Sequence, residues 1–211
     1  MVSLIFLYIS TVLTIFAILN PIGAVPTLMV LTENYTKKEK SRVIFKSIMV
    51  ATGMVLGFML LGVYIFSVLG ISISDFKVAG GALLFIVAFD MLQGKTSRTK
   101  LTQQETDESL EKEAIGVVPI GTPLLAGPGT ITTAIIYFNT NGYGPIEKFV
   151  VFIAIITVLI FSYIILRLST PLFERLGKTG SLIISRIMGL LLASIGVEFM
   201  VTGLIAIVAG I

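Results

Sequence analysis

Six long apolar stretches, separated by short polar connections, limit this chain to very few folds. They cover roughly residues 3–32, 47–70, 75–93, 115–138, 149–170 and 184–210. An α-helix needs about 20 apolar residues to cross the hydrocarbon of a membrane, so the stretches are of spanning length. With 55% hydrophobic residues and a mean hydropathy of +1.02, a soluble domain of 211 residues could not bury this much apolar surface. The sequence predicts an all-α integral membrane protein with six transmembrane helices.

The basic residues indicate how these helices are oriented. Only Lys77 and Lys148 fall after the second and fourth helices. The connections after the first, third and fifth helices hold all the others: Lys37, Lys38, Lys40, Arg42, Lys46, Lys95, Arg98, Lys100, Lys112, Arg167, Arg175, Lys178 and Arg186. Cytoplasmic connections carry such an excess of Lys and Arg. The pattern predicts that these three connections are cytoplasmic and that both termini lie outside, and we expect no nucleic-acid partner.

The two halves of the chain resemble each other. "PIGAVP" at 21–26 and "PLLAGP" at 123–128 share P-x-x-A-x-P, and "KVAG" at 77–80 corresponds to "RIMG" at 186–189. Three helices in a half is an odd number, so the second half would enter the membrane from the opposite face. Such inverted-topology repeats are typical of secondary transporters. We expect residues 1–93 to form the first three-helix repeat, 94–114 a cytoplasmic linker, and 115–211 the second repeat.

The segment "ILNPIGAVPTLMVLT" at 18–32 interrupts its own apolar helix. Pro21 and Pro26 have no N–H to donate to the carbonyl four residues earlier, and Pro119, Pro123 and Pro128 bring the same defect to the fourth helix. An unpaired backbone group in lipid costs several kcal/mol, so a break persists only where protein, water or a ligand satisfies it. One alternative is a packing kink satisfied by Ser and Thr side chains. Two breaks in corresponding helices favour discontinuous helices 1 and 4 that form a site.

The chemistry of such breaks suits a small zwitterion. One half-helix ends in bare carbonyls and is negative, and the next begins with bare N–H groups and is positive. Helices 1 and 4 run antiparallel, so facing breaks could bind a carboxylate on N–H groups and an ammonium on carbonyls. Neither motif contains a charged side chain, which favours a net-neutral solute. The predicted substrate-binding residues are Asn20, Pro21, Gly23, Ala24, Thr27, Gly121, Thr122, Gly127, Gly129, Thr130 and Thr133.

At "NPIGAVP" in the first helix and "TPLLAGPGTITTAI" in the fourth, the sequence resembles the MarC/SnatA family of six-helix bacterial and archaeal membrane proteins. The resemblance covers essentially the whole chain, including the charged central linker. It implies a secondary transporter of small neutral amino acids, such as glycine or alanine, in the inner or plasma membrane of a prokaryote. It also implies coupling to an ion gradient, of H⁺ or Na⁺.

Two acidic residues inside predicted helices are candidates for ion coupling. Glu198 lies 12 residues past Arg186, near the bilayer centre, where an acid is costly and by default functional. Asp90 lies near the cytoplasmic end of the third helix. A purely structural hydrogen bond to a neighbouring helix is the alternative for Glu198.

Several function classes are disfavoured or stay open. The chain contains no Cys and no His, so an intramembrane enzyme would lack a thiolate, an imidazole base or a His/Cys metal site, and we expect neither an enzyme nor a cofactor. The alternatives to uptake are an amino acid or small-solute exporter, a channel, and a non-transporting membrane scaffold. Contacts with membrane lipid are expected, and homo-oligomerisation is open. Gly53 and Gly57 in the second helix, and Gly189 and Ala193 in the sixth, form small-xxx-small patterns that predict close helix packing.

Overall fold

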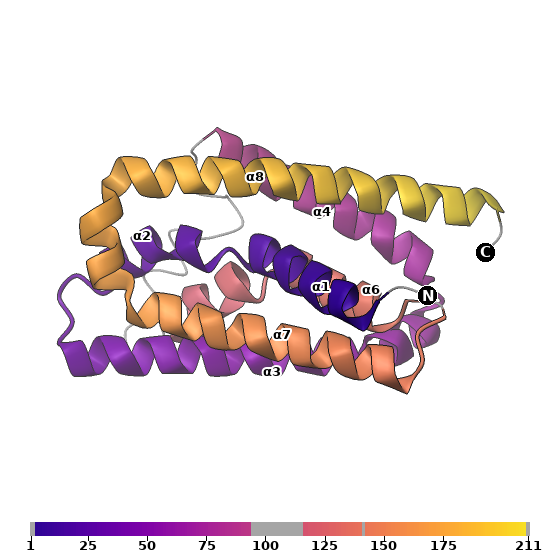
Figure 1. Cartoon of the computed structure of the whole chain (residues 1–211), viewed down its shortest axis with the longest axis horizontal. Coiled ribbons are helices and arrows are strands. Elements are labelled where there is room, and N and C mark those ends of the chain that lie inside the picture. Colours follow the sequence, from indigo (N-terminus) through magenta and orange to yellow (C-terminus); the bar gives the residue numbers. More distant parts are fainter. Residues whose placement is uncertain (1–2, 94–115, 141, 210–211) are drawn as a thin grey trace.

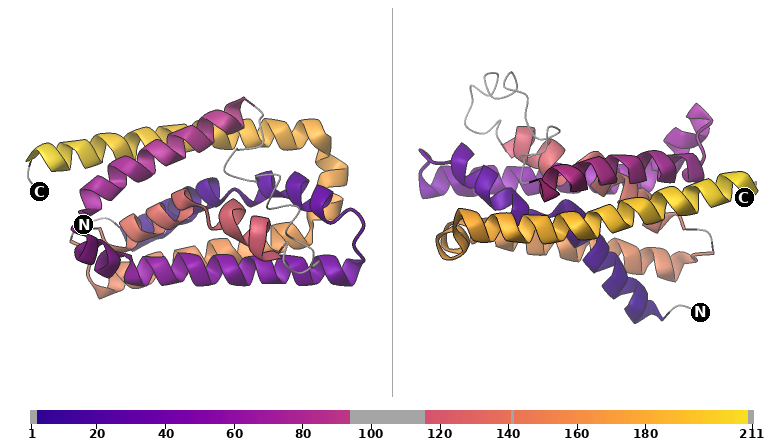
Figure 2. Two further views of the ribbon diagram at one scale, coloured as in Figure 1. Left: turned by 180° about the vertical axis from the view of Figure 1, so that it is seen from behind. Right: turned by 90° about the horizontal axis from the view of Figure 1, so that it is seen from above.

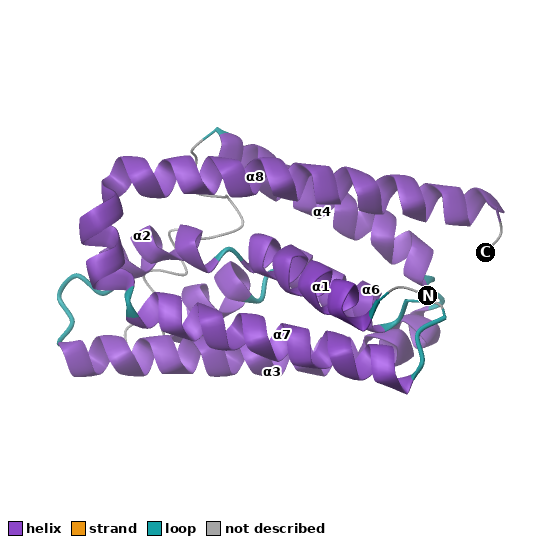
Figure 3. Ribbon diagram, in the orientation of Figure 1, coloured by secondary structure: helices purple, strands orange, loops and turns teal. Residues whose placement is uncertain are grey.

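Helices form all the regular structure that is described in this chain. The computed structural model describes residues 3–93, 116–140 and 142–209, coloured as helix and loop in Figure 3. The elements are α1 (Leu4–Leu19), α2 (Pro21–Leu31), α3 (Lys37–Leu69), α4 (Ile73–Leu92), the π-helix η3 (Val117–Leu125), α6 (Pro128–Phe138), α7 (Pro145–Arg167) and α8 (Ser169–Ala209). Within the described residues, four stretches are long and apolar enough to cross a membrane: Leu4–Leu31, Lys37–Leu69, Pro145–Arg167 and Leu182–Ala209. The predicted linker, residues 94–114, lies outside the described ranges.

Two stretches expected as polar connections are helical. The basic segment 37–46 forms the first turns of α3, because Thr36 and Glu39 cap that helix reciprocally. The Thr36 N–H donates to Glu39 Oε2 at 2.8 Å, and the Glu39 N–H donates to Thr36 Oγ1 at 3.3 Å. At the other end of the chain, α8 begins at Ser169 and bends at Gly177, whose φ of 63° is in the left-handed region. The membrane-spanning part of α8 follows this bend.

The helices form three layers (Figures 1 and 2). α4 and α8 make one outer layer and α3 and α7 the opposite one, while α1, α2, η3 and α6 lie between them. Both termini lie at one end of the molecule, and the α2–α3 and α7–α8 connections lie at the other (Figure 1). The interrupted helices therefore occupy the centre of the protein.

The two halves of the chain are interleaved. Every extensive helix contact of the first half is made with the second half: α1 packs on α6, α7 and α8, α2 on η3, α7 and α8, α3 on η3, α6 and α7, and α4 on α6 and α8. The first half therefore packs mainly on the helices of the second half.

The closest pairing is the antiparallel contact of α4 with α8. Three glycines of α8, seven residues apart, lie against three α4 residues with the same spacing: Gly203 on Ser74, Gly196 on Gly81 and Gly189 on Ala88. A Cβ atom at Gly196 would lie 2.8 Å from the carbonyl oxygen of Gly81 and 3.0 Å from the backbone nitrogen of Phe85. Small residues allow this approach, which gains packing energy where no hydrophobic effect drives association.

The packing predicted at Gly53 and Gly57 is wrong within the described residues. A Cβ atom at either glycine would have no other atom within 4 Å. These glycines lie on a part of α3 that no described helix covers, so the pattern alone did not identify the contact. The packing predicted at Gly189 is confirmed, because a Cβ atom there would lie 3.1 Å from the Ala88 carbonyl oxygen of α4.

Asn20 separates α1 from α2. It adopts φ 47° and ψ 60°, and it is the only non-glycine residue with positive φ among those described. Asparagine tolerates this left-handed conformation better than most residues. Its side-chain Oδ1 accepts a hydrogen bond from the Gly23 N–H at 3.1 Å, so Asn20 ends one helix and caps the next. Gly23 is required here, because a Cβ atom would lie 2.8 Å from Cγ of Asn20.

We expect Gly196→Ala to destabilise the protein by about 1–3 kcal/mol, because the added methyl meets backbone atoms that cannot rotate away. Gly57→Ala is the matched control, since it adds the same methyl in open space. Thermal unfolding in detergent, followed by circular dichroism, measures both. Equal melting temperatures for the two variants would contradict close packing of α4 on α8.

At the helix break, Asn20→Ala should lower stability by about 1–3 kcal/mol, because it removes the cap and places a residue that disfavours positive φ. Asn20→Gly keeps the backbone conformation and loses only the cap, so it should cost less than about 1 kcal/mol. Thermal unfolding in detergent, followed by circular dichroism, compares the stabilities of the two variants. If alanine is tolerated as well as glycine, the left-handed backbone at this position is not a constraint.

Candidate functional site

The second break lies between η3 and α6. The Ala126 N–H donates to the Gly121 carbonyl at 3.0 Å, which closes the last turn of η3. Gly127 is extended, with φ −72° and ψ 167°, as expected for a residue before proline. Pro128 then begins α6 and has no N–H. The first backbone N–H of α6 that bonds within the helix is that of Ile131, to the Gly127 carbonyl at 3.1 Å.

The start of α6 therefore presents donors. Helix geometry leaves the N–H groups of Gly129 and Thr130 without intrahelical acceptors, and no side chain caps this terminus. The positive end of the α6 dipole adds to their attraction for an anion.

The end of α1 presents acceptors. The carbonyl of Ala17 has lost its helical donor because residue 21 is proline. The carbonyl of Leu19 has lost its donor because the Gly23 N–H bonds to the Asn20 side chain instead. Ala17 and Leu19 are buried, at 5% and 2% exposure, so these carbonyls lie inside the protein.

These two opposite helix ends lie next to each other. A Cβ atom at Gly129 would lie 3.4 Å from Cγ2 of Ile18, in the last turn of α1. Further along, the Tyr137 hydroxyl of α6 donates to Thr14 of α1 at 3.1 Å, so the two helices run antiparallel. The negative end of α1 is therefore beside the positive end of α6. A glycine at position 129 permits this approach, because Leu84 also packs against it.

Two of the predicted threonines bond to the backbone at the second break. The Thr130 hydroxyl donates to the Leu125 carbonyl at 2.9 Å, and the Thr133 hydroxyl donates to the Gly129 carbonyl at 2.8 Å. Both residues are buried. Their hydroxyl oxygens retain acceptor capacity, while their protons hold the backbone of the break in place.

A cavity of about 410 Å³ adjoins the second break. It lies between α3, α4 and the η3–α6 junction, where Thr122, Ala126 and Pro128 form part of its wall. Thr132 also lines it, and the sequence analysis missed this residue although it lies in the same "TITT" run as Thr130 and Thr133. Much of the remaining wall is aromatic or aliphatic.

The residues predicted for the first break do not line this cavity. Asn20, Pro21 and Ala24 are buried, Gly23 and Thr27 are partly buried, and all belong to the α1–α2 junction and α2. Gly121 packs on α3, where a Cβ atom would lie 3.1 Å from the Ser47 carbonyl oxygen. The structure thus brings the two breaks together at the contact of Ile18 with Gly129, and the cavity extends from the second break alone.

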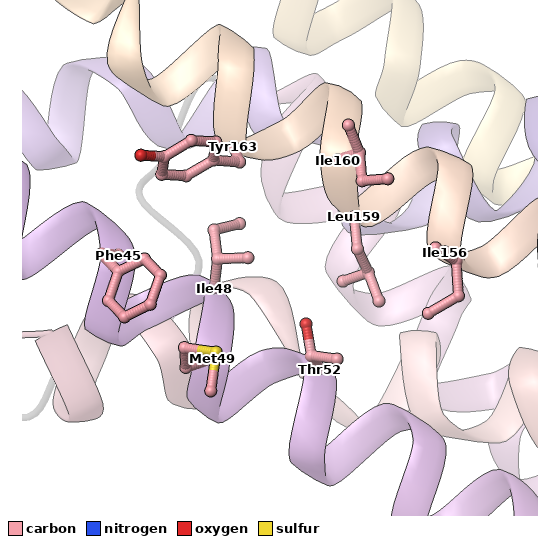
Figure 4. A pocket seen from close by; sticks show the side chains of 8 residues that line it. All are labelled: Phe45, Ile48, Met49, Thr52, Ile156, Leu159, Ile160 and Tyr163. Carbon is pink, nitrogen blue, oxygen red and sulfur yellow. The ribbon is translucent and has the colours of Figure 1, made fainter.

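A second cavity, of about 310 Å³, is a groove between α3 and α7 (Figure 4). Phe45 lies across from Tyr163 and Thr52 across from Ile156, so these helices are antiparallel. Thr52 and Tyr163 carry its only side-chain polar groups, and several lining residues are exposed on the outer surface. This groove is suited to an apolar chain rather than to a small polar solute.

The two acidic candidates lie on the outer helices α4 and α8. Asp90 is partly buried in the last turn of α4, and the next residue, Met91, accepts a hydrogen bond from the Asn20 amide through its sulfur at 3.9 Å. Glu198 is exposed on the outside of α8. The described residues contain no cluster of three or more carboxylates that could hold a metal ion.

Comparison with known proteins assigns the chain to a family. The model of the family described as "MarC family integral membrane protein" matches residues 5–208. A UPF0056 membrane protein of Methanocaldococcus jannaschii is 39% identical over 192 residues, which cover 90% of this chain and 92% of the relative. YhcE of Escherichia coli is 34% identical, over 97% of this chain and 94% of its own, and YvbG of Bacillus subtilis is 35% identical, over 91% of each. No solved structure matches the chain. The chain belongs to the MarC family of integral membrane proteins.

Proposed function

We propose that this protein is a secondary transporter of small neutral amino acids of the glycine and alanine type. In this proposal the substrate binds at the paired helix ends, and alternating access exposes that site to each side of the membrane in turn. The observation that carries the proposal is the contact of Ile18 with Gly129, which brings acceptors and donors of two interrupted helices together.

The chemistry of these ends matches an amino acid in both charge and size. The carbonyls of Ala17 and Leu19 can accept from an ammonium group, and the N–H groups of Gly129 and Thr130 can donate to a carboxylate. One zwitterion satisfies both sets and brings no net charge into the membrane. The close packing of Ile18 and Leu84 on Gly129 leaves little room at the ends themselves, which favours a small side chain.

Helix pairing supports an inverted-repeat architecture with six membrane passages. The second and third helices of each half pair antiparallel with their counterparts, α3 with α7 and α4 with α8. For the interrupted helices, α1 corresponds to η3 and α2 to α6, so the antiparallel contact of α1 with α6 matches the contact of η3 with α2. The packing partners of these pieces also correspond between the halves. α1 packs on α7 as η3 packs on α3, and α2 packs on α8 as α6 packs on α4. A two-fold axis in the membrane plane would relate such pairs.

Orientation and coupling complete the proposal. The basic α2–α3 and α7–α8 connections lie at the end of the molecule opposite both termini, which supports termini outside the cell. A gradient of H⁺ or Na⁺ supplies the driving force, with Asp90 and Glu198 as the candidate carboxyl groups. Asp90 is linked to the first break through its neighbour Met91. No catalytic step is part of the proposed function.

Purified protein in liposomes should accumulate radiolabelled glycine or alanine when an H⁺ or Na⁺ gradient is imposed. Gly129→Leu should reduce the initial uptake rate by at least about tenfold, because a side chain at this position separates the two helix ends; a loss of about 1.4 kcal/mol of transition-state stabilisation is enough. Gly57→Leu is the matched control, since it places the same side chain in open space.

Equal uptake by the two leucine variants would move the site away from the paired ends. Absence of gradient-driven uptake or exchange for any small neutral amino acid would reject the substrate class. Single-channel conductance in a planar bilayer, at rates far above transporter turnover, would instead identify a channel.

A further inference from the structure

Glu198 is an ionisable residue on the outside of a helix that the membrane is expected to surround. It lies about 4 Å from the middle of the spanning stretch Leu182–Ala209, at 1.5 Å rise per residue. Its side chain is exposed, between Val197 and Val201, which are 43% and 47% exposed. At this depth a glutamate is too short to reach the headgroups on either side, and a carboxyl group facing lipid is costly.

No residue in the described ranges satisfies this carboxyl group. The Thr202 hydroxyl donates to the backbone carbonyl of Glu198 at 2.8 Å, so this hydrogen bond does not involve the Glu198 carboxyl group. Among the residues that the structure describes, no side chain hydrogen-bonds or ion-pairs with the Glu198 carboxyl. A partner that carries polar groups at this depth would satisfy the carboxyl group.

The face of α8 around Glu198 has the spacing of a helix-packing seam. We call this set the outer seam; its residues are exposed and alternate three and four positions apart: Ile183, Ile187, Leu190, Ser194, Val197, Val201, Leu204 and Val208. A 3.5-residue repeat of this kind keeps one face of a helix against a partner along its whole length. Ser194 lies within the outer seam. Glu198 lies at the edge of the seam, one helical turn after Ser194.

We propose that the outer seam is the contact surface of a homodimer, in which Ser194 and Glu198 of two copies hydrogen-bond across a two-fold axis along the membrane normal. A second copy has the same orientation in the membrane, so this symmetry brings identical residues to the same depth. Glu198 flanks the outer seam, so the Glu198 carboxyl of each copy lies beside Ser194 of the other copy. A protonated carboxyl donates to the Ser194 hydroxyl oxygen, and such interhelical hydrogen bonds stabilise helix association in membranes.

The second copy is favoured over an unrelated partner because its polar groups are already at the required depth and spacing. The proposal does not depend on transport. It concerns the face of α8 opposite the α4 contact, and it would hold for a channel or a scaffold as well.

Cysteine crosslinking tests the proposal directly, because the chain contains no cysteine of its own. Leu190→Cys, Val197→Cys and Leu204→Cys each place one thiol on the outer seam. In native membranes treated with copper phenanthroline, each should give a disulfide-linked dimer on a denaturing gel. Ile160→Cys, on α7, is the matched control, because Ile160 is 55% exposed and lies away from the outer seam; it should stay monomeric.

The polar contact is tested in the Val201→Cys background, with monodisperse elution in detergent as the check on folding. Glu198→Gln keeps hydrogen-bonding capacity and should retain most of the crosslinked fraction. Glu198→Leu should weaken dimerisation by about 5- to 30-fold, the range expected when an interhelical hydrogen bond is lost in a membrane. Equal crosslinking in the two variants would overturn the role of Glu198. No crosslinking at the seam positions, or stronger crosslinking at Leu60→Cys beside Gly57 on α3, would overturn the interface itself.

Discussion

The need to satisfy backbone polar groups in a medium without water governs this structure. In a continuous helix the backbone groups hydrogen-bond to one another, but in this chain two helices are interrupted, at Asn20 and at Gly127. Each break is then stabilised by local groups: the Asn20 side chain bonds the Gly23 N–H, and the Thr130 hydroxyl bonds the Leu125 carbonyl. What is left over is a set of carbonyls at the end of α1 and a set of N–H groups at the start of α6. These remaining groups are the basis of the proposed site.

The layered arrangement protects these breaks from lipid. α4 with α8 and α3 with α7 cover the interrupted helices from two sides (Figures 1 and 2). The outer helices can be long and apolar because they carry no polar backbone defects of their own. The glycine contacts between α4 and α8 make that layer especially close-packed, whereas α3 and α7 leave an apolar groove between them (Figure 4). The two covering layers therefore differ in how tightly they are built.

Much of the fold could be predicted from the sequence, because apolar length and proline position act locally. The positions of both breaks follow from Pro21 and Pro128, which no later packing can supply with an N–H. The exact ends of the helices were harder to predict. The capping pair of Thr36 and Glu39 extends α3 through a basic segment whose composition alone indicates a connection.

Contacts between distant helices could not be read from the chain. Glycine spacing predicted packing correctly at Gly189 but wrongly at Gly53 and Gly57, since which face of a helix meets a neighbour depends on the whole assembly. For the same reason the sequence did not reveal that Thr132 lines the cavity. It also did not reveal that Glu198 points outward, because depth follows from position along a helix, whereas direction depends on its neighbours.

The interleaving of the two halves has a consequence for biosynthesis. The extensive contacts of α1 and α2 are all with elements from residue 117 onward, so the ribosome completes the first interrupted helix well before any of these partners exists. During that interval the bare carbonyls near Ala17 must be shielded by the insertion machinery, by water or by temporary contacts. Assembly of the core is therefore a late event, and a chain truncated at the central linker would lack every helix that contacts α1 and α2 extensively.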